Sequence, residues 1–158
     1  MTEAFVYEAH VKEEWVDYNG HMRDAYYALL FSLAVDGVQD AVGLDAAYRQ
    51  GTRCTMYVVE MHNFYLREVK LHDPLRIESR VLDCDSKRYH LHQTMLHEGR
   101  LAATCESLQL HVSQAGTPKA AVFPESILSR LRTRRLGRDE TDRIRHRSRR
   151  IGIGRGNA

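Results

Sequence analysis

The sequence Trp15-Val-Asp-Tyr-Asn-Gly-His-Met22 lies between an alternating stretch and a long apolar segment. Asp17 is its only carboxylate, Asn19 and His21 follow at steps of two residues, and Gly20 allows the backbone to bend. This pattern is typical of a strand that ends in a turn and continues into a helix. The N–H groups at a helix start favour negative charge nearby. The stretch therefore indicates chemistry at a carbonyl group.

The periodicity of the flanking sequence predicts one strand, one long helix and then four more strands. Apolar and polar residues alternate over 5–12, which is the strand period, and this strand is expected to lead directly into the Asp17 turn. From Arg23 to Gly43 apolar residues recur at helical steps, and a short second helix is expected over 45–50, ending at Gly51. The later stretches of strand composition are Thr55–Leu66, Leu75–Val81, Tyr89–Leu96 and Leu101–Val112.

This element order predicts an α+β fold. Consecutive strands joined by short turns pair antiparallel, and one helix covers one face of such a sheet. We therefore expect a five-stranded antiparallel sheet around one central helix over 1–123, a short C-terminal helix over 124–136 and an Arg-rich tail over 137–158. The tail has few apolar residues, so it is expected to be mobile or to lie on a neighbouring subunit. An uncovered sheet face or edge predicts a homodimer or homotetramer.

Composition excludes several classes of protein. With 158 residues, 43% of them apolar and 28% charged, the chain is typical of one soluble domain. The longest apolar run is too short for a membrane span and the N-terminus lacks an export pattern, so a cytoplasmic location without membrane contact is expected. Cys54, Cys84 and Cys105 form no Cys-x-x-Cys pair, and His90 and His92 are interpreted as strand-surface residues. No metal site is therefore predicted.

The Asp17 motif and the element order together resemble the hotdog fold of acyl-CoA thioesterases. The chain is most similar to the 4-hydroxybenzoyl-CoA thioesterase branch, whose members carry an Asp, two variable residues and a Gly just before the helix. The similarity covers residues 5–113. Four pieces also resemble the thioesterase-like domains fused to carnitine dehydrogenases and their stand-alone betainyl-CoA thioesterase relatives: 15–22, 59–62, 87–92 and 110–112.

The resemblance implies a role for each residue of the motif. Asp17 would attack the thioester carbonyl or activate a water molecule, and both mechanisms stay open. Asn19 and His21 would orient Asp17 or the water, with Gly20 beside the substrate. Apart from the resemblance, Glu60 lies in an expected strand of otherwise apolar residues, where burying an unpaired carboxylate is costly. It is therefore a candidate for a second catalytic acid in a neighbouring subunit's site or for a partner of a histidine. Coenzyme A is part of the substrate, so no cofactor is expected.

Substrate binding would need cations for the phosphates of coenzyme A and aromatic faces for a betaine group. Lys87 and Arg88 are the first candidates for the phosphates, and Arg53 and Arg67 are further ones. A quaternary ammonium group binds to aromatic faces. The candidates for these faces are Trp15, Tyr26, Tyr27, Tyr57 and Tyr65.

Alternative interpretations remain beside this one. Asp17 is also suited to cap a helix or turn. A hotdog enoyl-CoA hydratase or dehydratase typically carries Asp-x-Asn-Pro-x-His, whereas this motif lacks the Pro and its His comes one residue early. A non-catalytic protein could bind nucleic acid through the basic tail, with steep salt dependence. The tail has no aromatic residues, so nucleic acid is not an expected partner.

Overall fold

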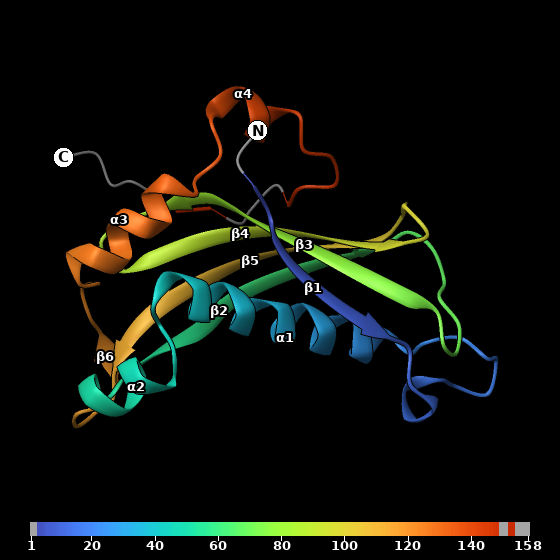
Figure 1. Cartoon of the computed structure of the whole chain (residues 1–158), viewed down its shortest axis with the longest axis horizontal. Helices are drawn as coiled ribbons and strands as arrows, with labels where there is room; N and C mark the ends of the chain where they lie inside the picture. The colour runs from blue at the N-terminus through green and yellow to red at the C-terminus, as the bar shows by residue number, and fades with distance from the viewer. Residues whose placement is uncertain (1–2, 149–151, 154–158) are drawn as a thin grey trace.

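The computed structural model describes residues 3–148, 152 and 153 and shows an antiparallel sheet curled around a long helix (Figure 1). The strand order is β1-β3-β4-β5-β2. The strands are β1 (Phe5–His10), β2 (Cys54–Tyr65), β3 (Pro74–Cys84), β4 (Arg88–His97), β5 (Arg100–Ser113) and β6 (Lys119–Ala120). The predicted fold is confirmed. The two-residue strand β6, which pairs with the end of β5, was not predicted because it is too short to show a period.

The helices are η1 (Glu13–Trp15), α1 (Asp24–Val42), α2 (Ala46–Thr52), α3 (Glu125–Thr133) and α4 (Arg138–Asp142). The three predicted helices follow the predicted order with small corrections, whereas the short helix η1 and the helix α4, which lies in the predicted tail, were not predicted. The short helix η1 separates β1 from the Asp17 turn, so the direct connection expected there is wrong. The stop expected at Gly51 is also wrong, because α2 continues through it to Thr52. Among the described residues no single helix is long and apolar enough to cross a membrane; α1 and α2 meet that criterion only as a pair, bent by 72°.

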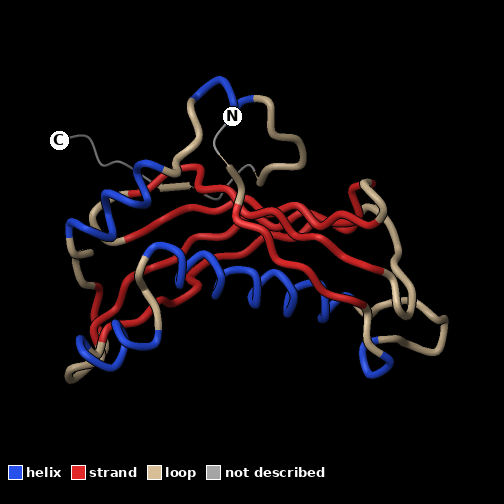
Figure 2. Tube along the Cα trace, in the orientation of Figure 1, coloured by secondary structure: helices blue, strands red, loops and turns tan. Residues whose placement is uncertain are grey.

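The long helix α1 lies in the hollow of the sheet (Figure 2). Leu30, Phe31 and Val38 on its inner face are completely buried, and burial of each such side chain stabilises the fold by about 1.5–3 kcal/mol. One polar contact fixes its position within this apolar layer. The buried amide of Gln93 on β4 donates to the Phe31 carbonyl at 3.1 Å and to Ser79 Oγ at 3.0 Å.

At its C-terminus α1 is capped by the short helix α3. Gly43 takes the left-handed conformation with φ 93°, which a residue without a Cβ adopts at little cost. The Arg130 guanidinium of α3 then donates to the Val42 carbonyl at 3.1 Å. A cation on the last carbonyl groups also complements the negative end of the helix dipole. The chain reversal after α1 therefore depends on Gly43.

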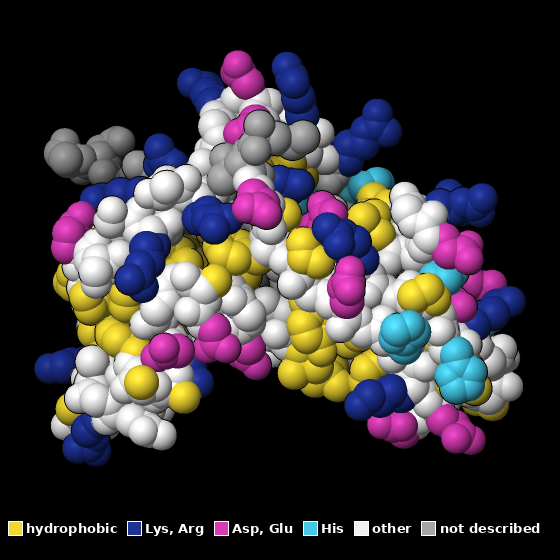
Figure 3. All heavy atoms as spheres, viewed as in Figure 1, with side chains coloured by type: hydrophobic (Ala, Val, Ile, Leu, Met, Phe, Trp, Pro, Cys, Tyr) yellow, Lys and Arg dark blue, Asp and Glu magenta, His cyan; other side chains and the backbone are white. Residues whose placement is uncertain are grey.

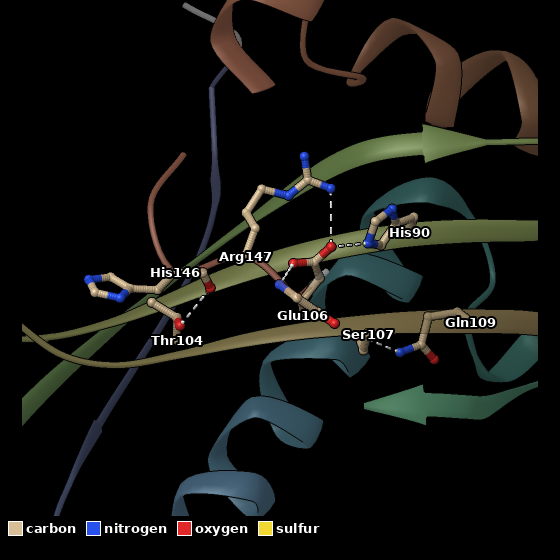
Figure 4. A network of polar contacts seen from close by, with 8 residues as sticks. His90, Thr104, Glu106, Ser107, Gln109, His146 and Arg147 are labelled. Carbon is tan, nitrogen blue, oxygen red and sulfur yellow. Dashed lines mark hydrogen bonds and ion pairs between the residues drawn. The ribbon is translucent and has the colours of Figure 1, made fainter. Parts of the chain in front are cut away.

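The outer face of the sheet is covered by the chain's own C-terminal segment. In Figure 3, Lys and Arg side chains surround this segment at the top of the molecule. Beneath it Glu106 of β5 is 1% exposed and accepts three hydrogen bonds (Figure 4). They come from His90 Nε2 at 2.7 Å, Arg147 Nη2 at 3.1 Å and the Ser148 N–H at 2.6 Å. Burial alone raises the pKa of Glu106, but these bonds outweigh it and hold the pKa below its ordinary value.

This cover corrects two expectations. The prediction that the tail is mobile or lies on another subunit is wrong for His146–Ser148, because Thr104 also donates to the His146 carbonyl at 3.4 Å. Residues 149–151 and 154–158 of the predicted tail lie outside the described residues. The interpretation of His90 and His92 as surface residues is also wrong, since the segment leaves them 3% and 2% exposed. Burial lowers the pKa of His92 to about 4, and the nearby Glu106 charge offsets this only in part.

Gly43→Ala should lower the free energy of unfolding by about 1–2 kcal/mol, because Ala strains at positive φ and its Cβ would displace the Arg130 guanidinium. Gly37→Ala is the matched control. Gly37 lies inside α1, where an added Cβ would meet no neighbouring side chain within 4 Å, so this change should stabilise by about 0.5–1 kcal/mol. Urea unfolding of both variants measures the two values. A Gly43→Ala variant as stable as wild type would contradict the cap.

The unfolding free energy should fall on acidification because His92 is neutral in the fold. The ordinary pKa of His92 is 6.5 and its pKa in the folded protein is about 4. Between these two pH values His92 therefore binds a proton in the unfolded chain but not in the folded one. The loss through His92 from about pH 7 to about pH 5 should be about 2 kcal/mol. Glu106, whose pKa is lowered, adds a further loss only as the pH falls below its ordinary value of 4.5.

Denaturant unfolding across this pH range should show a shallower dependence for His92→Gln than for wild type. The exposed His10 on β1 supplies the control His10→Gln, which should keep the wild-type dependence. Identical pH curves for His92→Gln and wild type would rule out His92 as the source.

Candidate functional site

Asp17 lies in a closed loop just before α1. Its N–H donates to the His21 carbonyl at 2.9 Å and its carbonyl accepts from Gly20 at 3.0 Å. Asp17 Oδ1 accepts from the backbone N–H groups of Asn19 at 2.8 Å and His21 at 3.3 Å. Gly20 has φ 78°, the left-handed conformation that this turn requires. Within the part of the chain that the structure describes, Asp17 Oδ2 accepts no hydrogen bond, so the half-buried carboxylate keeps one oxygen for a ligand.

The Asp17 loop is tied to the connection between β2 and β3. Met22 donates through its N–H to the Val69 carbonyl at 2.9 Å, and His21 Nε2 lies 3.1 Å from Glu68 Oε2. Sequence reasoning missed Glu68, because an acid in an irregular connection carries no periodic signal. The side chain of His21 therefore contacts Glu68, while only its backbone N–H contacts the Asp17 carboxylate.

The candidate aromatic residues do not form one cage. Trp15 stacks on Tyr26 with ring centroids 5.7 Å apart, and Lys12 Nζ lies 5.1 Å from the Trp15 ring centroid. Tyr27 and Tyr65 form a separate pair, 5.3 Å apart and nearly perpendicular. Tyr57 is remote from both pairs on β2, where its hydroxyl accepts from Gln114 at 3.1 Å.

A shallow cavity of about 350 Å³ lies beside the start of α1. It is lined by Met22, Asp24, Tyr27, Tyr65, Leu66, Arg67 and Glu68. Tyr27 is 4% exposed and its hydroxyl donates to the Arg67 carbonyl at 3.2 Å. Burial raises the pKa of Tyr27, and the neighbouring Glu68 charge raises it further. The cavity adjoins the Asp17 loop, since Met22 directly follows the loop and Glu68 contacts His21 within it.

Three of the four candidate phosphate ligands, Lys87, Arg88 and Arg53, lie at the opposite end of the sheet, whereas Arg67 lines the cavity beside the start of α1. Arg88 pairs with Leu110, which pairs on its other side with Tyr57 near the start of β2, whereas the Asp17 loop adjoins the end of β2. The helix α1, which runs between these ends, is roughly 28 Å long at 1.5 Å per residue. Arg88 is also paired with Asp85 Oδ2 at 2.6 Å. One chain alone therefore does not bring Lys87 and Arg88 to Asp17, and Arg53, which directly precedes β2, is equally remote.

Glu60 is exposed on the outer edge of β2. The strand shifts register between Val58 and Glu60, and the neighbouring Val58 and Val59 are 48% and 50% exposed. The expected cost of burying this carboxylate therefore does not arise within one chain. Among the residues that the structure describes, no contact within the single chain joins Glu60 to Asp17.

Among the same residues, no group of three His, Cys, Asp or Glu side chains could hold a metal ion.

Comparison with known proteins places this arrangement in a family. The model of the thioesterase-like superfamily matches residues 11–131. A betainyl-CoA thioesterase of Pseudomonas aeruginosa is 39% identical over 127 residues, which is 79% of each chain. An L-carnitine dehydrogenase/betainyl-CoA thioesterase of Agrobacterium fabrum is 41% identical over 75% of this chain, which spans only 25% of that longer protein.

A solved structure shares the same fold. A protein of Staphylococcus aureus in complex with CoA superposes with a TM-score of 0.80 at 29% identity, and the match covers 98% of each chain. The Asp17 loop and the curled sheet around α1 are thus set within a shared fold, and this chain belongs to the thioesterase-like superfamily of hotdog acyl-CoA thioesterases.

Proposed function

We propose that this chain hydrolyses betainyl-CoA, with Asp17 as the catalytic carboxylate. The observation that carries the proposal is the position of Asp17, which holds its own loop through one oxygen and keeps the other for a ligand beside the start of α1. The Pseudomonas aeruginosa relative, named a betainyl-CoA thioesterase, supports the acyl group. Capping and catalysis are compatible, because they use different oxygens of one carboxylate.

Two mechanisms fit the loop. As a nucleophile, Asp17 attacks the thioester carbonyl and expels the CoA thiolate, and water then hydrolyses the mixed anhydride to regenerate the carboxylate. As a general base, Asp17 removes a proton from the attacking water. In both cases N–H groups of the first turn of α1, which lack partners inside the helix, stabilise the developing oxyanion. Asn19 and His21 act through their backbone N–H groups, which orient Asp17, and Gly20 lets them converge on it.

Neither mechanism needs a metal or an organic cofactor, because a thiolate leaves without strong activation. Coenzyme A enters as part of the substrate, as the solved complex of the Staphylococcus aureus neighbour suggests. The proposed compartment is the cytoplasm, and the free thiols of Cys54, Cys84 and Cys105 suit a reducing environment.

The functional unit of the proposal is a homodimer paired through β2. Unpaired strand edges with exposed apolar side chains are suited to pairing with another copy. Tyr57, Val58 and Val59 are 38%, 48% and 50% exposed along this edge. Two-fold antiparallel pairing places the start of β2 in one copy beside its end in the other. Lys87 and Arg88 of a second copy, together with Arg53 and Glu60, then approach the Asp17 loop.

Asp17→Asn should lower kcat for betainyl-CoA by about 10²–10⁴-fold while the fold is retained, because Asn keeps the Oδ1 acceptor but loses the charge. Thiol release from a panel of acyl-CoA esters measures the effect, with Asp40→Asn on the exposed side of α1 as control. Wild-type turnover by Asp17→Asn would disprove the role of Asp17. No hydrolysis of any ester by wild type would disprove the proposed function.

Val59→Lys should convert the oligomer into a monomer of 18.3 kDa, since a charged side chain blocks pairing along the β2 edge. Val6→Lys is the matched control, because Val6 is 47% exposed on β1, the other edge strand. Sedimentation equilibrium should give a multiple of the chain mass for wild type and Val6→Lys. A monomeric wild type, or an unchanged mass for Val59→Lys, would exclude this interface.

A further inference from the structure

The cavity at the start of α1 combines aromatic rings with carboxylates. Tyr27 and Tyr65 form two of its walls, and Asp24 and Glu68 lie beside them. We infer that Tyr27, Tyr65, Asp24 and Glu68 form a subsite that selects a quaternary ammonium group on the acyl chain of the substrate. This inference rests on the proposed thioesterase function and names the residues that determine its specificity.

The two rings are arranged as adjacent walls. Their centroids are 5.3 Å apart and their planes meet at 88°, so the corner between the two perpendicular planes offers ring faces to a methylated cation. The hydrogen bond from the Tyr27 hydroxyl to the Arg67 carbonyl holds one wall in place. Aromatic faces attract cations within about 6 Å of the ring centroid.

The stacked pair of Trp15 and Tyr26 is less suited to the same task. Trp15 is 6% exposed, and its ring already has the Lys12 ammonium 5.1 Å from its centroid. A second cation on this ring would be repelled by Lys12. Of these two aromatic pairs, the open surface is therefore that of Tyr65, which is 51% exposed, with Tyr27 behind it.

The charges of the cavity favour a cation. Asp24 and Glu68 contribute two negative charges against the single positive charge of Arg67. A quaternary ammonium has no N–H group and forms no directed hydrogen bond, so long-range attraction to carboxylates and contact with aromatic faces are what recognise it. A neutral acyl group of the same shape would gain only the apolar contacts with Met22 and Leu66.

The position of the cavity also matches the reaction. In a betainyl ester one methylene group separates the ammonium nitrogen from the thioester carbonyl, so the cation must bind next to the catalytic carboxylate. Glu68 contacts His21 at 3.1 Å, and the His21 N–H donates to Asp17 Oδ1 at 3.3 Å. The cation subsite and the proposed catalytic oxygen therefore belong to one connected group of residues.

The test compares betainyl-CoA with 3,3-dimethylbutanoyl-CoA, which replaces the ammonium nitrogen by carbon and keeps the shape. Wild type should prefer the betainyl ester in kcat/KM. Tyr65→Leu and Glu68→Gln should each reduce this preference about fivefold to tenfold, chiefly by slowing the betainyl ester. Tyr65→Phe keeps the aromatic face and should keep the preference, and Glu125→Gln on α3 controls for a distant loss of charge.

The outcomes separate the two proposals. Equal kcat/KM of wild type for the two esters would overturn the cation subsite and leave the thioesterase function standing. A betainyl preference that survives both Tyr65→Leu and Glu68→Gln would also overturn it, because the selecting residues would then lie elsewhere. If wild type hydrolyses neither these nor other acyl-CoA esters, the proposed function fails and the subsite inference fails with it.

Discussion

The burial of α1 in the hollow of the sheet is the contact on which the other features depend. Its inner face is apolar, but Gln93 of the sheet donates to the Phe31 carbonyl from within that layer. Sliding α1 along the sheet would leave this buried amide without one of its two acceptors, which is costly. The first turn of α1 is therefore held at one end of the sheet. The position of Asp17 follows from this core contact, since its loop ends where α1 begins.

Within that loop, one carboxylate has a structural task and is placed for the chemical task that we propose for it. Asp17 Oδ1 holds the N–H groups of Asn19 and His21 in the manner of a turn cap. These two hydrogen bonds also restrict the rotation of the carboxylate and so fix the direction in which Oδ2 points. The choice between cap and catalyst, which the sequence left open, is thus not exclusive. Because the turn itself orients the Asp17 carboxylate, no additional side chain is required to orient it.

On the opposite face of the sheet, hydrogen bonds and ion pairs hold the covering segment in place, whereas apolar burial holds α1. Glu106 is a carboxylate in the middle of a strand, and it is buried only because Arg147, Ser148 and His90 supply donors to it. A buried carboxylate without such donors would be strongly unfavourable. The same contacts order an Arg-rich segment that has little apolar surface of its own. Charge pairing replaces a hydrophobic face as the reason for docking.

The sequence by itself determined the strand and helix order, since alternation and three-to-four spacing depend only on neighbouring residues, and the bounds of α1 agree with the prediction to within a residue. It also marked Asp17, through a local motif. Only the tertiary structure decided that Glu68 meets His21 and that Arg147 reaches Glu106, 41 residues away along the chain. Such pairs form between segments brought together by packing of the core. No local pattern encodes them, because the distance between their members is set by the whole fold.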